Sequence, residues 1–534
     1  MSATLAAVAV ATFHSLGLYW SPPQGAPDNP ARVEFREAGA SAWRKGLEPW
    51  FDARNAEYRG SLVELTPGTS YEIRLTLQSG AGTTLKASTW EENLKVKRTV
   101  QVPPGTRQLV IEASDSGSEK EGYVVFTGRN VLDGGSEEHC VVVKQGAHHV
   151  MIRGLVIRNC KRAAIMIERD SRGGAQTHDI VIEDNEISGW GGYDNHKPGR
   201  NVADSDAAVH CNYYRETDDA KRPDRIVIQR NTIRDPRYGS NPWQTGAGAR
   251  KHPAGPIGVF FLRCGKNHVI RYNDIYSKNG KYFMDGLSGE DNFSNAGFPW
   301  ADSDIYGNRI SQVYDDAIEA EGGNRNVRIW GNFIDEAFVA IANAPVAVGP
   351  LYVWRNVSHR MARMYEPDGD PDLERRGPFI KAGSKQAAAG GGRAYYFHNT
   401  VLQPPGKRYS YGAGWGIFGS AGPLTNVVSR NNIWHIHKEV HVHGQPKFHA
   451  IGRAERGGVD AASDLLRPVY ASSGTQYPDL ANHPGNFHLK PGTPGAGSAE
   501  PIANFNDRYV GRADVGAHQS GTPPQRFGRA ANSP

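Results

Sequence analysis

The segment "VRIWGNFI" (residues 327–334) lies between two related segments, "SDIYGNRI" (303–310) and "LYVWRNV" (351–357). In each of them alternating apolar residues precede an asparagine, and a further apolar residue follows it closely. Asn308, Asn332 and Asn356 recur at an interval of 24 residues. Alternation is typical of short strands, and a short fixed period indicates units that bury their apolar sides against one another. We therefore predict a stack of short coils.

Five more copies extend this array in both directions: "IVIEDNEI" (180–187), "IVIQRNTI" (226–233), "HVIRYNDI" (268–275), "AYYFHNTV" (394–401) and "NVVSRNNI" (426–433). The asparagine recurs at positions 185, 231, 273, 399 and 431, and insertions lengthen the intervals. Asparagine suits a left-handed turn, and stacked amides can form a ladder. The pattern resembles the right-handed parallel β-helix of the pectate-lyase-like superfamily, which implies a β-helix domain over residues 93–445.

The composition predicts an all-β protein. The 62 glycines and 33 prolines divide the 534 residues into short segments, and no long stretch has a helical period. A net charge of +5 with interspersed signs is compatible with an anionic substrate but not indicative of nucleic-acid binding. No apolar run is long enough to span a membrane, and "LAAVAVA" near the start is too short for a signal peptide. The resemblance to β-helix carbohydrate-active proteins nevertheless implies a secreted or periplasmic protein.

The two ends of the chain differ from the repeat region. Residues 1–92 alternate apolar and polar residues between turns, and "LTPGTSY" (65–71) resembles the tyrosine corner of a fibronectin type III β-sandwich. Trp20 and Trp43 are its predicted core aromatics, and the module would support its neighbour or bind sugar. Residues 446–534, with "NFHLKPGTPGAGSA" (486–499), are similar to the closing segment of β-helix proteins, followed by a flexible tail that we expect to be disordered after about residue 520.

Cysteine and histidine give weaker signals. Four cysteines at 140, 160, 211 and 264 fit neither a zinc pattern nor a dense disulfide scaffold, so we predict buried free thiols. The run "WHIHKEVHVHGQPKFH" places His435 with His437, and His441 with His443, on shared strand faces. Zinc binding there is an alternative, but no nearby acid or thiol completes a site.

The second strand of each predicted coil carries the chemistry. We expect one apolar residue of each strand to point inward: Val209, Val259, Leu287, Ile318, Ile341, Ile380 and Ile417. Their successors would then point to solvent on a common face: His210, Phe260, Ser288, Glu319, Ala342, Lys381 and Phe418.

Asp285 in "MDGL" lies one predicted coil away from Asp315 and Asp316 in "YDDAIEAEGG". Neighbouring strands are about 4.8 Å apart, so the three carboxyl groups would face one point. Three such groups provide a proton donor with a raised pKa and a base that activates water. The alternatives are turn capping and a structural Ca²⁺.

These motifs resemble the Asp-Gly and Asp-Asp motifs of family 28 glycoside hydrolases, the polygalacturonase type. The resemblance implies that Asp285 and Asp315 position water and that Asp316 protonates the leaving oxygen, with 315 and 316 able to exchange roles. Lys381 matches the lysine of the sugar-binding Arg-Ile-Lys motif, whose arginine is Phe379 here, with Arg376 nearby. The Gly-His-Gly motif of that family is missing.

Other residues are predicted to bind substrate. Glu319 and Glu321 would contact substrate or, together with Asp316, hold Ca²⁺; the alternative is a solvated strand face. Lys381 would pair either with an acid of the protein or with a sugar carboxylate. His210 is expected at a distal subsite or on the surface. Trp243 and Trp300 lie in long insertions, where they would stack on sugar rings or pack within their loops.

We therefore expect an extracellular polysaccharide-degrading glycoside hydrolase that binds a polysaccharide or oligosaccharide, neutral or acidic, and needs no cofactor. An inverting mechanism requires carboxyl groups about 6.5–9.5 Å apart. One alternative is a polysaccharide lyase acting on a uronate with the help of Ca²⁺, for which Lys381, Arg360, Arg363 and Tyr365 are candidate residues. A second alternative is a non-catalytic glycan-binding adhesin.

Overall fold

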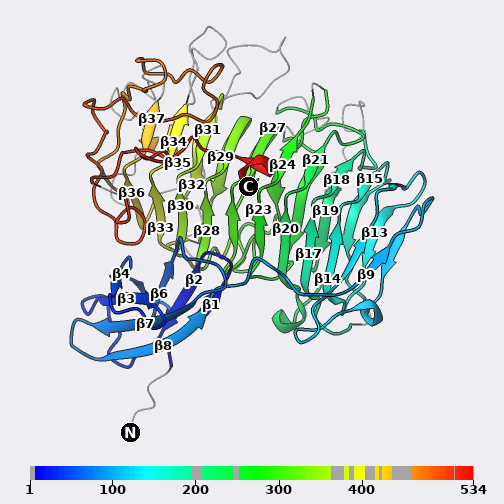
Figure 1. The fold of residues 1–534 in the computed structure, drawn as a ribbon, viewed down its shortest axis with the longest axis horizontal. Coiled ribbons are helices and arrows are strands. Elements are labelled where there is room, and N and C mark those ends of the chain that lie inside the picture. Colours follow the sequence, from blue (N-terminus) through cyan, green and yellow to red (C-terminus); the bar gives the residue numbers. More distant parts are fainter. Residues whose placement is uncertain are drawn as a thin grey trace.

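The computed structural model describes residues 6–171, 173–194, 206–243, 252–278, 280–361, 378–383, 390–402, 415–419, 424–435, 451–452, 459–509 and 511–532. Parallel strands stack side by side along most of the molecule, as a parallel β-helix does (Figure 1). The predicted fold class, a β-helix preceded by a small β-sandwich, is confirmed. Within the described residues the helices are short 3-10 turns, η1 (Ala113–Asp115), η2 (Asp219–Lys221) and η7 (Gly528–Asn532). Among these residues, none of the helices has the length and apolar character needed to span a membrane.

One wall of the β-helix is a sheet of 12 strands. In spatial order they are β9 (Val96–Gln101), β11 (Tyr123–Thr127), β14 (His148–Arg153), β17 (His178–Glu183), β20 (Asp224–Gln229), β23 (Val269–Arg271), β26 (Asp304–Tyr306), β28 (Val327–Trp330), β30 (Leu351–Trp354), β33 (Ala394–Phe397), β36 (Val427–Arg430) and β39 (Val459–Ala462).

The remaining walls form a bent sheet of 19 strands. Its short strands are β12 (Val131–Asp133), β15 (Val156–Arg158), β18 (Glu186–Ser188), β21 (Thr232–Arg234), β24 (Asp274–Tyr276), β31 (Val357–His359), β34 (Thr400–Leu402) and β37 (Ile433–His435). The others are β10 (Leu109–Ile111), β13 (His139–Val143), β16 (Ala163–Ile167), β19 (Ala207–Asn212), β22 (Ile257–Leu262), β25 (Leu287–Ser288), β27 (Arg309–Glu319), β29 (Phe333–Asn343), β32 (Pro378–Ala382), β35 (Trp415–Gly419) and β38 (Ile451–Gly452). The inward residues of both sheets make one continuous apolar core.

The repeated asparagines form the predicted ladder. Asn308 Nδ2 donates to Asn332 Oδ1 at 3.0 Å, and Asn332 Nδ2 donates to Asn356 Oδ1 at 2.9 Å. Two details differ from the prediction. The ladder residue of the last copy is Asn432, not Asn431. The left-handed conformation belongs to the residue before each ladder asparagine, such as Arg355 (φ 54°), because the asparagine itself is needed as a buried donor and acceptor.

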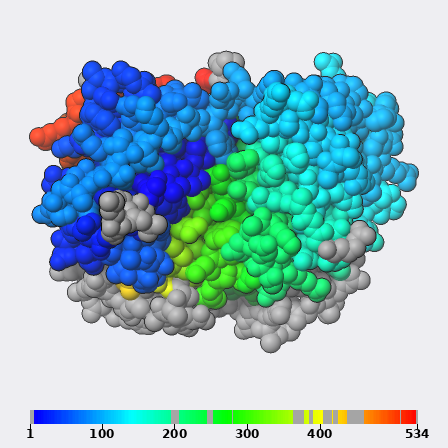
Figure 2. Space-filling model, turned by 90° about the horizontal axis from the view of Figure 1, so that it is seen from below, coloured from blue at the N-terminus to red at the C-terminus, as the bar shows by residue number. Residues whose placement is uncertain are grey.

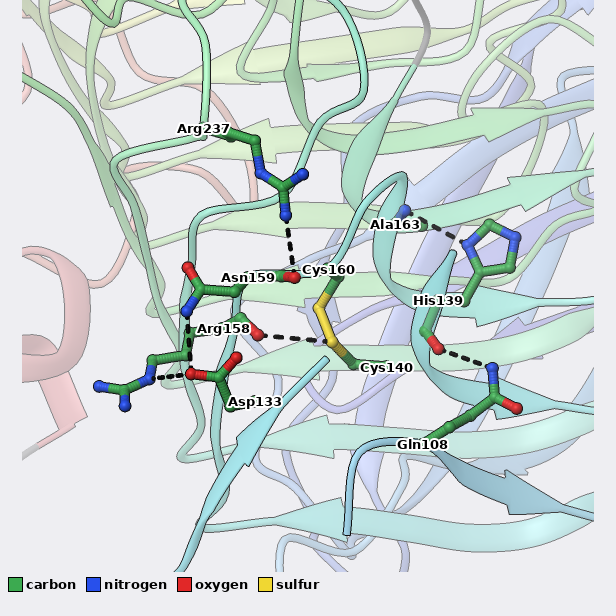
Figure 3. Close-up of a disulfide and its surroundings, with 9 residues drawn as sticks. All are labelled: Gln108, Asp133, His139, Cys140, Arg158, Asn159, Cys160, Ala163 and Arg237. Carbon is green, nitrogen blue, oxygen red and sulfur yellow. Dashed lines mark hydrogen bonds and ion pairs between the residues drawn. A yellow bond between two sulfur atoms is a disulfide. The ribbon is translucent and has the colours of Figure 1, made fainter. Parts of the chain in front are cut away.

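The prediction of free thiols is wrong, because the cysteines form two disulfides, Cys140–Cys160 and Cys211–Cys264. Figure 3 shows the first, which joins β13 to the turn after β15. The second joins β19 to the turn after β22. Each bond links neighbouring coils, which no sequence spacing of 20 or 53 residues indicates by itself.

Removing a disulfide should destabilise the coils on the N-terminal side of the molecule. Closing loops of this size stabilises a fold by about 3–4 kcal/mol per bond. The double variant Cys211→Ser/Cys264→Ser is therefore expected to unfold at least a few degrees lower in a calorimetric scan than the parent chain. An unchanged transition, with the parent shown to be oxidised by mass spectrometry, would contradict this expectation.

The N-terminal residues form two antiparallel sheets that fit a β-sandwich. The strands are β1 (Val8–Ala11), β2 (Leu16–Trp20), β6 (Glu57–Leu62) and β5 (Trp50–Asp52) in one sheet, and β4 (Arg44–Lys45), β3 (Ala31–Glu37), β7 (Ser70–Leu77) and β8 (Gly82–Ser88) in the other. Trp20 is buried in the core, as predicted. Trp43 is not, because the guanidinium groups of Arg36 and Arg74 lie over its ring, each 4.5 Å from the centroid.

The sandwich packs against the 12-stranded sheet (Figures 1 and 2). Tyr19 Oη donates to Asp302 at 2.7 Å, and Arg271 forms a two-pronged ion pair with Glu92 at 2.6 and 2.7 Å. Charge-assisted hydrogen bonds of this kind help to fix the orientation of the two parts.

The C-terminal segment packs on the β-helix. Tyr470, Phe487 and Val515 join an apolar cluster with residues of β31, β34 and β37. The predicted disorder after about residue 520 is not observed in the described residues 521–532. Phe527 lies 5.2 Å from the Phe333 ring, and Gly528 N donates to the carbonyl of Gly307 at 2.8 Å. One aromatic residue in a Pro- and Gly-rich tail is enough to dock it.

Candidate functional site

The predicted register of the second strands is confirmed. Ile318 pairs with Leu287 on one side and Ile341 on the other, and Ile341 pairs with Ile380. The outward column runs in the predicted order, with Glu319 beside Ala342 and Ala342 beside Lys381. The prediction that this column points to solvent is wrong for most of its described members, because neighbouring side chains pack over them, as Asn292 does over Glu319. Those that are buried are His210, Phe260, Ser288, Glu319 and Ala342.

The three aspartates converge as predicted. One oxygen from each of Asp285, Asp315 and Asp316 lies within 4.8 Å of the other two, and all three residues are buried. Asp285 accepts a hydrogen bond from the backbone N–H of Asp316 at 3.0 Å. These oxygens are closer together than the carboxyl separation of about 6.5–9.5 Å that is expected for inversion.

A bulge in β27 explains how consecutive aspartates share one site. Val313 pairs with Ala337 and Asp316 pairs with Val339, so two residues of β27, Tyr314 and Asp315, lie opposite one residue of β29, Phe338. In a regular strand Asp315 and Asp316 would point to opposite faces. The extra residue breaks the alternation, and bulges next to functional sites commonly re-aim side chains in this way.

Lys381 reaches the aspartates from two rungs away. Its Nζ lies 2.6 Å from Asp316 Oδ2 and 3.2 Å from Glu321 Oε1. The intervening rung carries Ala342, whose small side chain leaves the path open. Only 23% of the Lys381 side chain is exposed, so its ammonium group is held among carboxylates with little water.

Glu319 and Glu321 complete the acidic group. Glu319 accepts from Asn292 Nδ2 at 3.2 Å, and Glu321 accepts from the backbone N–H of Ala344 at 3.1 Å. Both glutamates are buried, so neither is a solvated strand face. Two oxygens of the cluster, Asp316 Oδ1 and Glu319 Oε2, are buried without a hydrogen-bond partner.

Burial and mutual repulsion raise the pKa of these acids. Burial is the main cause, and neighbouring carboxylates add to it. The pKa of Asp285 lies well above its ordinary value, that of Asp316 is about 8, and those of Glu319 and Glu321 are about 7. Burial would lower the pKa of Lys381, but the surrounding carboxylates raise it well above its ordinary value.

His252, from an insertion, is a site residue that the sequence did not reveal. Its Nε2 lies 2.9 Å from Asp315 Oδ2, and its Nδ1 lies 2.7 Å from the carbonyl oxygen of Pro253. A carbonyl and a carboxylate are both acceptors, so both ring nitrogens are placed to donate, as they do in an imidazolium. Burial opposes this charge, but Asp315 raises the pKa of His252 to about 9. Its position in a long insertion marked a region that can carry function. The coil register does not extend into insertions, so it could not place His252 at the acids.

The other predicted binding residues fall into three groups. Trp243 lies at the site, 4.5 Å from the His252 ring and 5.8 Å from Phe338. His210 packs against Phe260, with the ring centroids 5.2 Å apart, two rungs before the Asp285 rung. Trp300 contacts Arg222 and Lys266 instead of the acids. Arg376, Arg363, Tyr365, His437, His441 and His443 lie outside the described residues.

The donor set suits a hard cation. The ligand atoms that the three aspartates bring together are carboxylate oxygens, which Ca²⁺ prefers, and one oxygen of Asp316 and one of the neighbouring Glu319 have no hydrogen-bond partner. Asp285, Asp315 and Asp316, with Glu319 beside them, therefore fit Ca²⁺. The set expected from the sequence, Asp316, Glu319 and Glu321, shares Asp316 and Glu319 with this one, whereas Glu321 pairs with Lys381.

The raised acid pKa values predict that the metal-free protein loses stability as pH rises. Between the ordinary value of about 4 and the folded values of about 7–8, the folded state binds more protons than the unfolded state. The stabilisation is therefore complete below about pH 4 and is lost by about pH 8. In a chelator the melting temperature should fall between pH 5 and 8, and Asp316→Asn should flatten the slope. A melting temperature that rises across this window would contradict the assignment.

The chain was compared with family models, curated proteins and solved structures. No protein-family model and no curated protein matches the chain. Among solved structures, the chain is similar to pectate lyase Pel9A at 11% sequence identity, with a TM-score of 0.39. The match covers 79% of this chain and 86% of the pectate lyase.

Proposed function

We propose that the protein is a polysaccharide lyase that cleaves a uronate-containing glycan in the covered column of the β-helix. The observation that carries this proposal is the placement of Lys381 Nζ, 2.6 Å from Asp316, against three aspartates whose oxygens lie within 4.8 Å of one another. A lyase needs a cation site for the uronate carboxylate and a base beside it, and these residues offer both.

The chain's own residues have distinct roles in this proposal. Lys381 takes the C5 proton of the uronate, the C5–H electrons form the C4=C5 double bond, and the C4–O bond breaks. The leaving oxygen then receives a proton from water or from a neighbouring acid. Bound Ca²⁺ would supply positive charge that binds the uronate carboxylate and offsets the acids that raise the pKa of Lys381. His252 would hold Asp315 in place.

A glycoside hydrolase is the second candidate, because the pKa of Asp316 is about 8. Asp316 would then carry a proton at neutral pH, as a general acid must. The close spacing of the aspartates argues against inversion, the mechanism expected from the sequence.

The product distinguishes the two reactions. Elimination creates an unsaturated uronyl end that absorbs in the ultraviolet, whereas hydrolysis gives only new reducing ends. With a panel of polyuronates and neutral glycans, we expect absorbance to rise in step with depolymerisation on a polyuronate. Reducing ends without absorbance would favour the hydrolase. Tight binding without cleavage of any glycan would favour the adhesin.

We infer that the N-terminal sandwich is fibronectin type III-like and supports the β-helix. The tyrosine-corner contact is present, because Tyr71 Oη accepts from the Thr66 N–H at 2.9 Å. We also infer that the protein works outside the cytoplasm, since both disulfides require an oxidising compartment.

A further inference from the structure

A second cluster of metal-binding side chains lies on the 12-stranded sheet. His148 pairs with His178 in the parallel ladder of β14 and β17, so His149 and Asp179 follow them on the same two rungs. The four residues make a two-by-two grid. His149 and Asp179 share the left-handed conformation, with φ of 50° and 52°, which turns both side chains to the same corner of the coil.

The nitrogen and oxygen donors converge. His178 Nδ1 lies 2.6 Å from Asp179 Oδ2, and His149 Nε2 lies 4.0 Å from the same oxygen. Donor atoms of His149, His178 and Asp179 all lie within 4.8 Å of one another. Ligands about 2.0–2.2 Å from a shared ion lie at most about 4.4 Å apart, so these donors need only small shifts to share one ion.

The surroundings complete the cluster. His148 Nδ1 lies 3.2 Å from His149 Nδ1, so it can orient that ring while His149 Nε2 faces Asp179. Arg225, on the next rung, donates from Nε to Asp179 Oδ1 at 2.8 Å and from Nη2 to Asp179 Oδ2, the oxygen that also faces the two histidines, so it holds the carboxylate in place and an ion would share Oδ2 with it or displace it. Burial lowers the pKa of His148 and His149, which favours the neutral rings that bind metals.

The cluster is accessible from a cleft of about 400 Å³. His149, Asp179 and Arg225 line it on the β-helix side, and Phe13 and Trp90 line it on the side of the sandwich. An ion can therefore reach the site, which lies where the two parts of the chain meet.

We propose that His149, His178 and Asp179 bind Zn²⁺, with His148 as a positioning residue. Two imidazoles and one carboxylate suit Zn²⁺, and they differ from the all-oxygen group around Asp316, which suits Ca²⁺. The ion would tie two neighbouring coils together beside the cleft. Binding of the ion to His178 Nδ1 would displace the proton of the hydrogen bond between this nitrogen and Asp179 Oδ2.

Calorimetric titration of untagged, calcium-saturated protein with Zn²⁺ tests this proposal. We expect one site that His149→Ala and His178→Ala each weaken at least tenfold, with a smaller loss for His148→Ala. The matched controls are His210→Ala and the double variant His441→Ala/His443→Ala, which should bind as the parent does. Unchanged affinity in His149→Ala and His178→Ala, or no binding by the parent, would overturn the proposal.

X-ray absorption of the zinc-loaded parent provides a test that needs no variant. Two imidazole ligands are expected in the first shell. A shell of oxygen atoms alone would overturn the assignment, even if the histidine variants failed to fold.

Discussion

Lys381→Ala should lower kcat on a polyuronate by about 10³-fold, within the range of about 10²–10⁴-fold that a general base contributes. The variant loses the group that we place against the acids as a proton acceptor, and circular dichroism checks that it remains folded. Initial rates of unsaturated product formation measure the effect. Lys144→Ala is the matched control, since Lys144 pairs with Glu168 at the surface of the same β-helix.

Lys381→Arg separates a base from a simple ion-pair partner. Arginine keeps the positive charge beside Asp316 and Glu321, but its guanidinium does not give up a proton in proteins. If Lys381 is the base, Lys381→Arg should be nearly as inactive as Lys381→Ala. If Lys381 only neutralises the acids, Lys381→Arg should retain most of the parent activity, and the proposed role would be lost.

The coil register could be predicted from the sequence because each rung repeats the same physical problem. An apolar residue such as Ile318 must point inward, and its successor Glu319 must then point away from the core. The repeated asparagine marks where each coil turns, so the rungs can be counted. This was enough to place Asp285 one rung from Asp315.

The geometry of the site depends on features that leave no periodic signal. The bulge that brings Asp315 and Asp316 together is one extra residue in β27. The contact of Lys381 with Asp316 depends on the small side chain of Ala342. Ala342 lies on β29, the rung between the strands that carry Asp316 and Lys381. His252 comes from an insertion, whose path no repeat determines. The disulfides likewise follow the stacking of coils and not the spacing of cysteines.

The positions of the charged groups suggest that stability and activity are in conflict at this site. Three aspartates and two glutamates are buried around one lysine. Each acid that ionises without a compensating cation costs stability, because burial disfavours the charged form. A protein selected only for stability would place apolar residues here. This cost supports the proposal that the cluster binds a cation and a substrate.

Asp316→Asn should abolish turnover and weaken Ca²⁺ binding at least tenfold, yet raise the melting temperature of the metal-free protein at pH 8. The amide keeps the size of the side chain but removes a buried charge that ionises at about pH 8. Activity should fall by about 10³-fold or more, since the variant loses both a cation ligand and the partner of Lys381. Calcium titration, initial rates and thermal scans in chelator measure the three effects.

Asp133→Asn is the control for this experiment, because Asp133 pairs with Arg158 at the surface, away from the acidic cluster. It should leave calcium affinity and rate unchanged. Asp285→Asn should follow Asp316→Asn in calcium affinity if both residues bind the ion. Full activity of Asp316→Asn with undiminished calcium binding would contradict the lyase site. Loss of activity with calcium binding intact would instead favour Asp316 as the general acid of a hydrolase.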